Sequence, residues 1–311
     1  MAPGRRAIID VGTNSVKLLV AEVDGRLVTP LVEHSEQTRL GRGFYVEHRL
    51  QADAIAQTAQ AVSAFARIAA SHAAPARVIA TSAARDAVNQ GELLDAIRAA
   101  SGLPVEIISG EQEADWAFRG VTSDPKLHGQ PLLILDVGGG STEFILGEHG
   151  HFTFRQSFDL GSVRLLEKLH PGDPPTLHDI ANCREWLQDF LHREIGPALE
   201  NFLRDEAHRE TKLVGTGGTA TILARMVLRT EAFDRERIEA TRLHHQQVLE
   251  YLVHLWSLSL ADRRQIPGLP ANRADVILMG VAIYEVVMRH FRLDDLRVST
   301  RGLRFGAVME G

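Results

Sequence analysis

The chain has 311 residues, of which 44% are hydrophobic and 24% charged, and its formal net charge at pH 7 is −6. This length predicts about two domains of roughly 100–200 residues each, and the ordinary charge content argues against intrinsic disorder. The acidic balance and the 6% aromatic content are not those of a protein that binds a nucleic-acid polymer. The single cysteine, Cys183, excludes an internal disulfide and is typical of a cytoplasmic protein.

No segment has the pattern of a membrane helix or of a secretory signal. The most apolar run, residues 276–288, contains Gly280 and Glu285 and is shorter than the ~20 residues that cross a bilayer. Near the N-terminus, Asp10 interrupts the apolar residues that follow two arginines. We therefore expect no membrane contact and a cytoplasmic location.

One sequence pattern occurs twice, at an offset of 126 residues. Residues 8–22 read IIDVGTNSVKLLVAE and residues 134–148 read ILDVGGGSTEFILGE, with six of fifteen positions identical. Each copy is typical of a strand, a turn rich in Gly and Ser, and a second strand, with Asp10 or Asp136 just before the turn. We expect two related α/β domains, residues 1–126 and 127–311, with their hairpins facing each other across a cleft and the last helix packing back on the first domain. The alternative is a chance similarity between two buried hairpins.

Helices and strands alternate between the two hairpins. The periodicity predicts helices over residues 52–70, 93–100 and 111–119 and strands over 77–80 and 105–108. This order favours parallel strand pairs covered by helices. A polar stretch with Pro and Gly at residues 122–130 is the expected domain boundary. Beyond the second hairpin we expect helices over 163–169, 177–195, 197–208, 243–257 and 272–290, and strands over 211–214 and 296–298.

Three turns have the composition of phosphate-binding loops. Glycines let a turn bring several N–H groups to one anion, and Ser and Thr add hydroxyl donors. The turn at residues 215–219 also opens a predicted helix, whose N-terminus attracts anions. The alternatives are a structural hairpin turn at residues 138–140 and a tight strand–helix turn that Thr219 caps. The candidate phosphate-binding residues of these turns are Gly12, Thr13, Asn14, Ser15, Gly138, Gly139, Gly140, Ser141, Thr142, Gly217, Gly218 and Thr219.

Two further side chains are candidates for acid–base and anion-binding chemistry. Glu111 and Glu113 begin a predicted helix, where an acidic residue commonly complements the helix dipole. Glu113 projects to a different side from Glu111, toward the expected cleft, and is the candidate base. Arg85 follows a predicted strand and can bind a phosphate with two N–H groups, the alternative being a surface arginine beside Asp86. The fourteen histidines show no zinc-ligand spacing.

Eight segments in order resemble the motifs of the exopolyphosphatase/guanosine pentaphosphate phosphohydrolase (Ppx/GppA) family, part of the actin/sugar-kinase/Hsp70 superfamily. They lie between residues 8 and 306 and read IIDVGTNSVKLLV, ATSAARDAVN, ISGEQEADWAFRGV, LILDVGGGSTEFILG, FDLGSVRL, LVGTGGTAT, NRADVILMG and GLRFG. The resemblance implies an α/β fold of two duplicated actin-like (ribonuclease H-like) domains around an interdomain cleft. Family members often have GLREG instead of GLRFG, and longer members carry additional helical domains.

The resemblance also implies roles for individual residues. Glu113 matches the general base that activates the attacking water, and Arg85 and Arg273 match basic residues that hold the anionic substrate. Asp136 and Glu143 match carboxylates near Mg²⁺ and phosphate. Their counterpart in the first domain is Asp10.

The activity that the resemblance implies is Mg²⁺-dependent hydrolysis of the terminal phosphoanhydride of inorganic polyphosphate, with Mn²⁺ as a substitute metal and a monovalent cation as a further cofactor. The first alternative is removal of the 5′-terminal phosphate of guanosine pentaphosphate. A polyphosphate- or nucleotide-binding regulator without catalysis is a second alternative, and a sugar kinase fits the motifs less well. We also expect a homodimer, formed through the apolar C-terminal helices.

Overall fold

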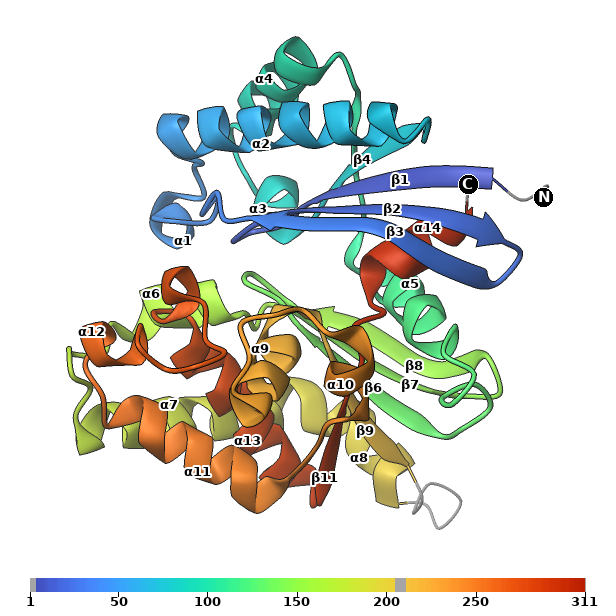
Figure 1. The fold of residues 1–311 in the computed structure, drawn as a ribbon. Helices are drawn as coiled ribbons and strands as arrows, with labels where there is room; N and C mark the ends of the chain where they lie inside the picture. Colours follow the sequence, from blue (N-terminus) through green and yellow to red (C-terminus); the bar gives the residue numbers. More distant parts are fainter. Residues whose placement is uncertain (1–3, 205–210, 311) are drawn as a thin grey trace.

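The computed structural model describes residues 4–204 and 211–310, which form two mixed β-sheets with helices around them (Figure 1). The first sheet has the order β3-β2-β1-β4-β5 and comprises β1 (Gly4–Val11), β2 (Val16–Asp24), β3 (Leu27–Glu36), β4 (Ala76–Ala80) and β5 (Val105–Ile107). The second has the order β10-β11-β9-β6-β7-β8 and comprises β6 (Leu132–Val137), β7 (Thr142–Glu148), β8 (His151–Phe158), β9 (Lys212–Thr216), β10 (Arg242–His244) and β11 (Asp295–Val298). We call the parts of the chain that form these sheets the first and the second unit.

The two sheets share one topology. In the first unit β1 pairs antiparallel with β2 and parallel with β4, and in the second β6 pairs antiparallel with β7 and parallel with β9. In each unit a third strand, β3 or β8, continues the hairpin as an antiparallel meander. The predicted duplication is confirmed at the level of strand order, which a chance similarity of two hairpins does not explain. The predictions from sequence lacked β3, β8 and β10.

Most of the predicted helices are present. Those of the first unit are α1 (Phe44–Glu47), α2 (Ala52–Ser71), α3 (Ser82–Arg85), α4 (Gln90–Ser101) and α5 (Gly110–Thr122). The second unit contains α6 (Ser162–Leu169), α7 (Leu177–Phe190) extended by a π-helical turn (Leu191–Ile195), α8 (Gly196–Arg204), α9 (Gly217–Leu228), α10 (Arg235–Ala240), α11 (His245–Trp256), α12 (Leu260–Arg263), α13 (Ile277–Phe291) and α14 (Leu303–Glu310). The end of the helix predicted over 197–208 lies outside the described residues. In the part of the chain that is described, no helix is both long and apolar enough to span a bilayer.

The C-terminal helices differ from the sequence prediction in two respects. The helix predicted over 272–290 begins only at Ile277, because a short 3₁₀ turn (Ala271–Arg273) follows Pro270. Every residue of α13 from Ile277 to Met288 is buried, and its apolar side chains belong to the core of the second unit. Because α13 is covered by its own chain, it does not provide the surface for the homodimer that we expect through the C-terminal helices.

Helices α5 and α14 lie between the two sheets, with α14 packed on the first sheet and α5 packed on the second sheet and on α14 (Figure 1). Trp116 of α5 packs with Phe305 of α14 against the first sheet, while Phe118 packs against β6 and β7 of the second. The two helices touch closely at Gly306, where a Cβ would lie 1.9 Å from the carbonyl oxygen of Trp116. This packing fixes the first turn of α5, which carries Glu113, at the junction of the two units.

Candidate functional site

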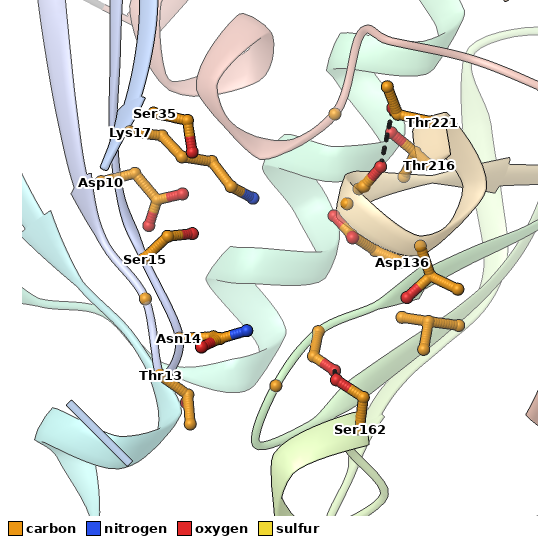
Figure 2. A pocket seen from close by; sticks show the side chains of 18 of the residues that line it. Asp10, Thr13, Asn14, Ser15, Lys17, Ser35, Asp136, Ser162, Thr216 and Thr221 are labelled. Atoms are coloured by element: carbon orange, nitrogen blue, oxygen red, sulfur yellow. Dashed lines mark hydrogen bonds between the residues drawn. The ribbon is translucent and has the colours of Figure 1, made fainter. Parts of the chain in front are cut away.

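A cleft of about 420 Å³ lies where the two hairpins face each other (Figure 2). One wall comes from the β1–β2 hairpin and carries Asp10, residues 12–15 and Lys17. The opposite wall comes from the β6–β7 hairpin and from the turn between β9 and α9. The structure thus brings the three Gly-rich turns of the sequence prediction to one site.

The N-terminus of α6 holds the turn between β6 and β7. The backbone N–H of Ser162 donates to the Gly138 carbonyl at 3.0 Å, and that of Val163 donates to the Gly139 carbonyl at 2.8 Å. Gly161, just before the helix, must lack a side chain, because a Cβ there would lie 2.3 Å from the Gly139 oxygen. In a trans peptide the next N–H points opposite to the carbonyl, so these bonds turn the N–H groups of Gly139 and Gly140 away from α6. The turn is thereby prepared to bind an anion.

The turns of the two units touch at one end of the cleft. A Cβ on Gly140 would lie 2.5 Å from the Ser82 hydroxyl and 2.7 Å from the Thr13 hydroxyl. A Cβ on Gly139 would lie 3.0 Å from Cβ of Thr13. Glycine is required here because the two backbones approach each other closely.

The turn between β9 and α9 packs against the Asp136 side chain, one residue before the end of β6. Gly217 has a φ of +81°, and a Cβ on it would lie 2.3 Å from Oδ1 of Asp136. Thr219, in the first turn of α9, also lines the cleft. The positive end of the α9 dipole lies beside Asp136 and the open space of the cleft.

Glu113 is a buried acid of the site with a raised pKa. Its side chain lines the cleft from the first turn of α5 and is 8% exposed. Burial and the nearby Glu143 carboxylate raise the pKa of Glu113 well above its ordinary value of 4.5. Arg85 opposes this shift, since its Nη1 lies 3.5 Å from Oε2 of Glu113. A carboxylate with a raised pKa is a stronger proton acceptor than an ordinary one.

Asp136 and Glu143 lie across the β6–β7 ladder from each other. Burial raises the pKa of Asp136 to about 6 and that of Glu143 to about 7, and the charge of Asp136 contributes to the second shift. The Ser157 hydroxyl donates to Oε1 of Glu143 at 2.7 Å and partly opposes it. Asp10 on the opposite wall also has a raised pKa, because it is buried.

Three cations balance these acids. Lys17 lies opposite Asp10 in the β1–β2 ladder, and Figure 2 shows its ammonium group extending toward the wall that carries Asp136. Nη2 of Arg273 donates to the Ser15 hydroxyl at 2.8 Å and so joins the two units. Arg304 lines the cleft at the start of α14. Sequence reasoning missed Lys17 and Arg304, although Lys17 has a signal in the repeat: it is 126 residues before Glu143.

The structure does not bring two of the predicted phosphate ligands into the cleft lining. Thr142 is fully buried, and its hydroxyl donates to the Leu160 carbonyl, because the first residue of β7 faces the core. Arg85 lies behind Glu113, where it donates to the Ile108 carbonyl at 3.1 Å. The prediction that Thr142 binds phosphate was wrong, and Arg85 contacts the candidate base instead of the cleft surface.

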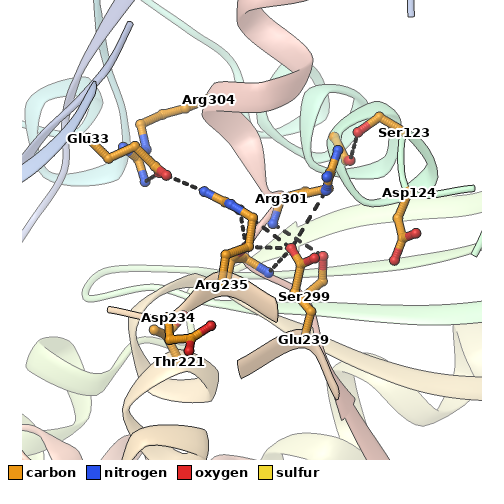
Figure 3. Close-up of polar contacts among 12 residues, drawn as sticks. Glu33, Ser123, Asp124, Thr221, Asp234, Arg235, Glu239, Ser299, Arg301 and Arg304 are labelled. Atoms are coloured by element: carbon orange, nitrogen blue, oxygen red, sulfur yellow. Dashed lines mark hydrogen bonds and ion pairs between the residues drawn. The ribbon is translucent and has the colours of Figure 1, made fainter. Parts of the chain in front are cut away.

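A polar network borders the cleft at the end formed by β3 and α10 (Figure 3). Glu33 of the first unit pairs with Arg235 of the second and, at 3.3 Å, with Nη2 of Arg304. Nη1 of Arg304 also donates to the Leu18 carbonyl at 2.6 Å. The guanidinium carbon of Arg235 lies 4.9 Å from the centre of the Phe305 ring. Glu33 is thus the carboxylate that joins Arg235 to Arg304.

Several buried polar atoms in the cleft have no hydrogen-bond partner. Among the described residues these atoms are Asp10 Oδ1, Asn14 Nδ2, Ser82 Oγ and Thr216 Oγ1, all on residues that line the cleft. A buried polar atom without a partner is costly unless a ligand or water satisfies it. The cleft is therefore built for a polar ligand.

The carboxylates also fit a divalent cation of the hard type. No three His, Cys, Asp or Glu side chains in residues 4–204 and 211–310 are grouped closely enough to form a complete metal cage. Mg²⁺ does not require one, since it keeps several waters and binds proteins through one or two carboxylates together with substrate phosphates. The mutually repelling Asp136 and Glu143, with the unpaired Oδ1 of Asp10 opposite, match that donor set.

The chain is similar in sequence and structure to proteins of one family. The model of the Ppx/GppA phosphatase family matches residues 19–310. Exopolyphosphatase 2 of Mycobacterium tuberculosis H37Rv is 34% identical over 323 residues, with 99% of each chain covered. An exopolyphosphatase structure from Cytophaga hutchinsonii is 27% identical, with a TM-score of 0.87 over 97% of this chain and 96% of that one. The Aquifex aeolicus family member is 28% identical, with a TM-score of 0.80 over 99% and 97%. The chain belongs to the Ppx/GppA phosphatase family, with two actin-like α/β domains.

Proposed function

We propose that this chain hydrolyses the terminal phosphoanhydride bond of inorganic polyphosphate and releases orthophosphate. Two kinds of evidence support the proposal: membership of a phosphatase family, and the similarity over the whole chain to proteins described as exopolyphosphatases. The main structural support for the proposal is the position of Glu113. This buried acid has a raised pKa and faces a cleft lined by the three candidate phosphate-binding turns.

In the proposed reaction Glu113 takes a proton from a water molecule. The water oxygen forms a bond to the terminal phosphorus, the bridging P–O bond breaks, and the remaining chain leaves as a phosphate anion. Phosphoryl transfer depends mainly on alignment and on neutralisation of charge. The N–H groups of residues 139–141 and 217–219 supply donors to the phosphate oxygens, and Lys17 and Arg273 supply positive charge.

We propose that one or two of the carboxylates of Asp136, Glu143 and Asp10 hold Mg²⁺ together with the substrate phosphates, and we propose Mn²⁺ as a substitute and a monovalent cation as a further cofactor. A divalent cation supplies charge neutralisation and orientation of the phosphate oxygens. The charge of the site supports this assignment. Four carboxylates, those of Glu113 and the three metal-site acids, would otherwise repel a polyanionic substrate.

Guanosine pentaphosphate is the second candidate substrate, favoured by the apolar part of the cleft lining. The lining includes the apolar side chains Ile222, Phe233, Pro270, Val276 and Ile277. A nucleoside buries apolar ring surface, whereas a polyphosphate chain has none. The same catalytic groups would then remove the 5′-terminal phosphate.

Orthophosphate release distinguishes the candidates. The purified chain is incubated with long-chain polyphosphate and, separately, with guanosine pentaphosphate, each with Mg²⁺ or with a chelator. We expect Mg²⁺-dependent release from polyphosphate. Release from the guanosine compound alone would assign the second function, and tight binding of either compound without release would identify a regulator. Light scattering of the same sample tests the proposed homodimer, and fractionation of cells tests the proposed cytoplasmic location.

A further inference from the structure

Arg164, in the first turn of α6, is bound to the turn between β6 and β7. Its Nε–H donates to the Gly140 carbonyl at 2.8 Å. Its Nη2 lies 2.9 Å from Oδ1 of Asp159 in the same unit and 3.5 Å from Oδ2 of Asp86 in the first unit. With a side chain only 17% exposed, Arg164 thus connects the turn to both units.

Tyr45 of the first unit lies against this arginine. The guanidinium carbon of Arg164 is 4.5 Å from the centre of the Tyr45 ring. The Tyr45 hydroxyl is buried next to the turn, since a Cβ on Gly140 would lie 2.6 Å from it. Glu167, one helical turn after Arg164, accepts the backbone N–H of Gly43 at 2.6 Å. The segment of α1 is thus docked onto α6.

The carbonyls of the three glycines in the turn, Gly138, Gly139 and Gly140, are held in two different ways. Those of Gly138 and Gly139 accept backbone N–H groups of α6, within the second unit. The carbonyl of Gly140 accepts a side chain, and residues of the first unit contact that side chain. The orientation of the peptide between Gly140 and Ser141, and hence of the Ser141 N–H, therefore depends on contact between the units.

We propose that Arg164 is a positioning residue for phosphoryl transfer. Packed against the Tyr45 ring, it fixes the orientation of the Gly140 peptide. The anion-binding turn is therefore complete only while the two units are in contact. The inference rests on the proposed function. A group that completes the site in this way acts on the transition state more than on the first binding of substrate. Its loss lowers kcat and changes KM little.

The test is steady-state orthophosphate release from polyphosphate by Arg164→Lys, Tyr45→Leu and Tyr45→Phe. Lysine keeps the charge but lacks the planar guanidinium, and leucine removes the ring, whereas phenylalanine keeps it. We expect kcat to fall roughly 10- to 100-fold in the first two variants, with KM changed less than about threefold, and Tyr45→Phe to retain most of the wild-type kcat. The matched control is Arg155→Lys, whose guanidinium lies 4.0 Å from the Phe152 ring, outside the cleft lining; it should keep the wild-type kcat.

The kcat of the double variant Arg164→Lys/Tyr45→Leu should be no lower than that of the less active single variant, because both substitutions disrupt the same contact. Wild-type kcat in Arg164→Lys, or a rise in KM at unchanged kcat, overturns the proposal. Thermal unfolding is measured for each variant, and if Arg164→Lys does not fold, the split between Tyr45→Leu and Tyr45→Phe decides. A wild-type chain that releases no phosphate refutes the proposed function instead, so the two failures are distinguishable.

Discussion

Lys17 and Glu143 occupy equivalent positions in the two duplicated hairpins. Lys17 lies directly opposite Asp10 in the β1–β2 ladder, and Glu143 lies directly opposite Asp136 in the β6–β7 ladder. Residues opposite each other in a ladder point to the same face, so both pairs project toward the cleft. The duplicated hairpin therefore carries a cation on one wall and an extra carboxylate on the other. This asymmetry gives one wall a cation, which we propose pairs with phosphate, and the other wall two carboxylates, which we propose as metal ligands.

The Lys17→Met variant tests the cationic wall. Loss of a charged hydrogen-bond donor to phosphate should raise KM for polyphosphate roughly tenfold or more. The pKa values of Asp10 and Asp136 should rise further, because Lys17 lowers both. Steady-state kinetics provides the measurement. Lys168→Met, which removes a lysine that lies over Trp186 outside the cleft lining, is the control and should leave KM unchanged. An unchanged KM in Lys17→Met would remove Lys17 from the binding site.

The Gly217→Ala variant tests the support of Asp136. A Cβ at this position would clash with Oδ1 of Asp136, and the φ of +81° adds strain of about 1–2 kcal/mol. We expect a lower unfolding free energy and a large loss of phosphate release. Gly91→Ala in α4, outside the cleft lining, is the control, since a Cβ there would meet no heavy atom within 4 Å beyond its chain neighbours and the backbone of its own helix. Denaturant unfolding and activity are measured on both. Equal behaviour of the two variants would contradict the structure of this turn.

The pH profile of kcat/KM tests the pairing of Glu113 with Arg85. Glu113 must be deprotonated to act as a base, and its raised pKa makes kcat/KM rise with pH through a midpoint above 4.5. Arg85 favours the carboxylate, so Arg85→Gln should move this acidic limb to higher pH while the plateau above it is largely retained. A limb that stays in place, or moves to lower pH, would show that Arg85 does not set the pKa of Glu113.

Metal dependence tests the assignment of Asp136. Asp136→Asn keeps the size of the side chain but removes its charge, so the Mg²⁺ concentration for half-maximal activity should rise at least about tenfold. Asp95→Asn, on the exposed face of α4, is the control and should keep the wild-type dependence. The activity is titrated with Mg²⁺ after removal of metal by a chelator. If both variants follow the wild-type curve, Asp136 is not a metal ligand.

The duplicated hairpins were predictable from sequence because strand periodicity and turn composition are properties of short, continuous segments. Asp10 and Asp136 stand at the same place in two similar segments, and strand period and turn composition alone locate them. The position of Glu113 followed from its place at a helix start beside the expected cleft. The third strands, β3 and β8, were missed because they carry many polar, exposed residues and lack a continuous apolar pattern.

The sequence predictions failed where the strand face of a side chain, or a contact between residues far apart in the sequence, decides the outcome. Thr142 follows Ser141 by one residue, and this single step turns its side chain from the cleft to the core. Lys17 is an ordinary strand residue until the cross-strand register places it beside Asp10. The contact between Arg164 and Tyr45 joins the two units, and the amino-acid pattern around either residue does not predict it.

The most direct test of the account is orthophosphate release from long-chain polyphosphate, in Mg²⁺, by the wild type, Glu113→Gln and Glu111→Gln. Glu111 starts the same helix, but its side chain is 79% exposed, which makes it a matched control. We predict that Glu113→Gln lowers kcat by about 10²- to 10⁴-fold with little change in KM, while Glu111→Gln retains the wild-type rate. A Glu113→Gln variant that releases phosphate at the wild-type rate would contradict it.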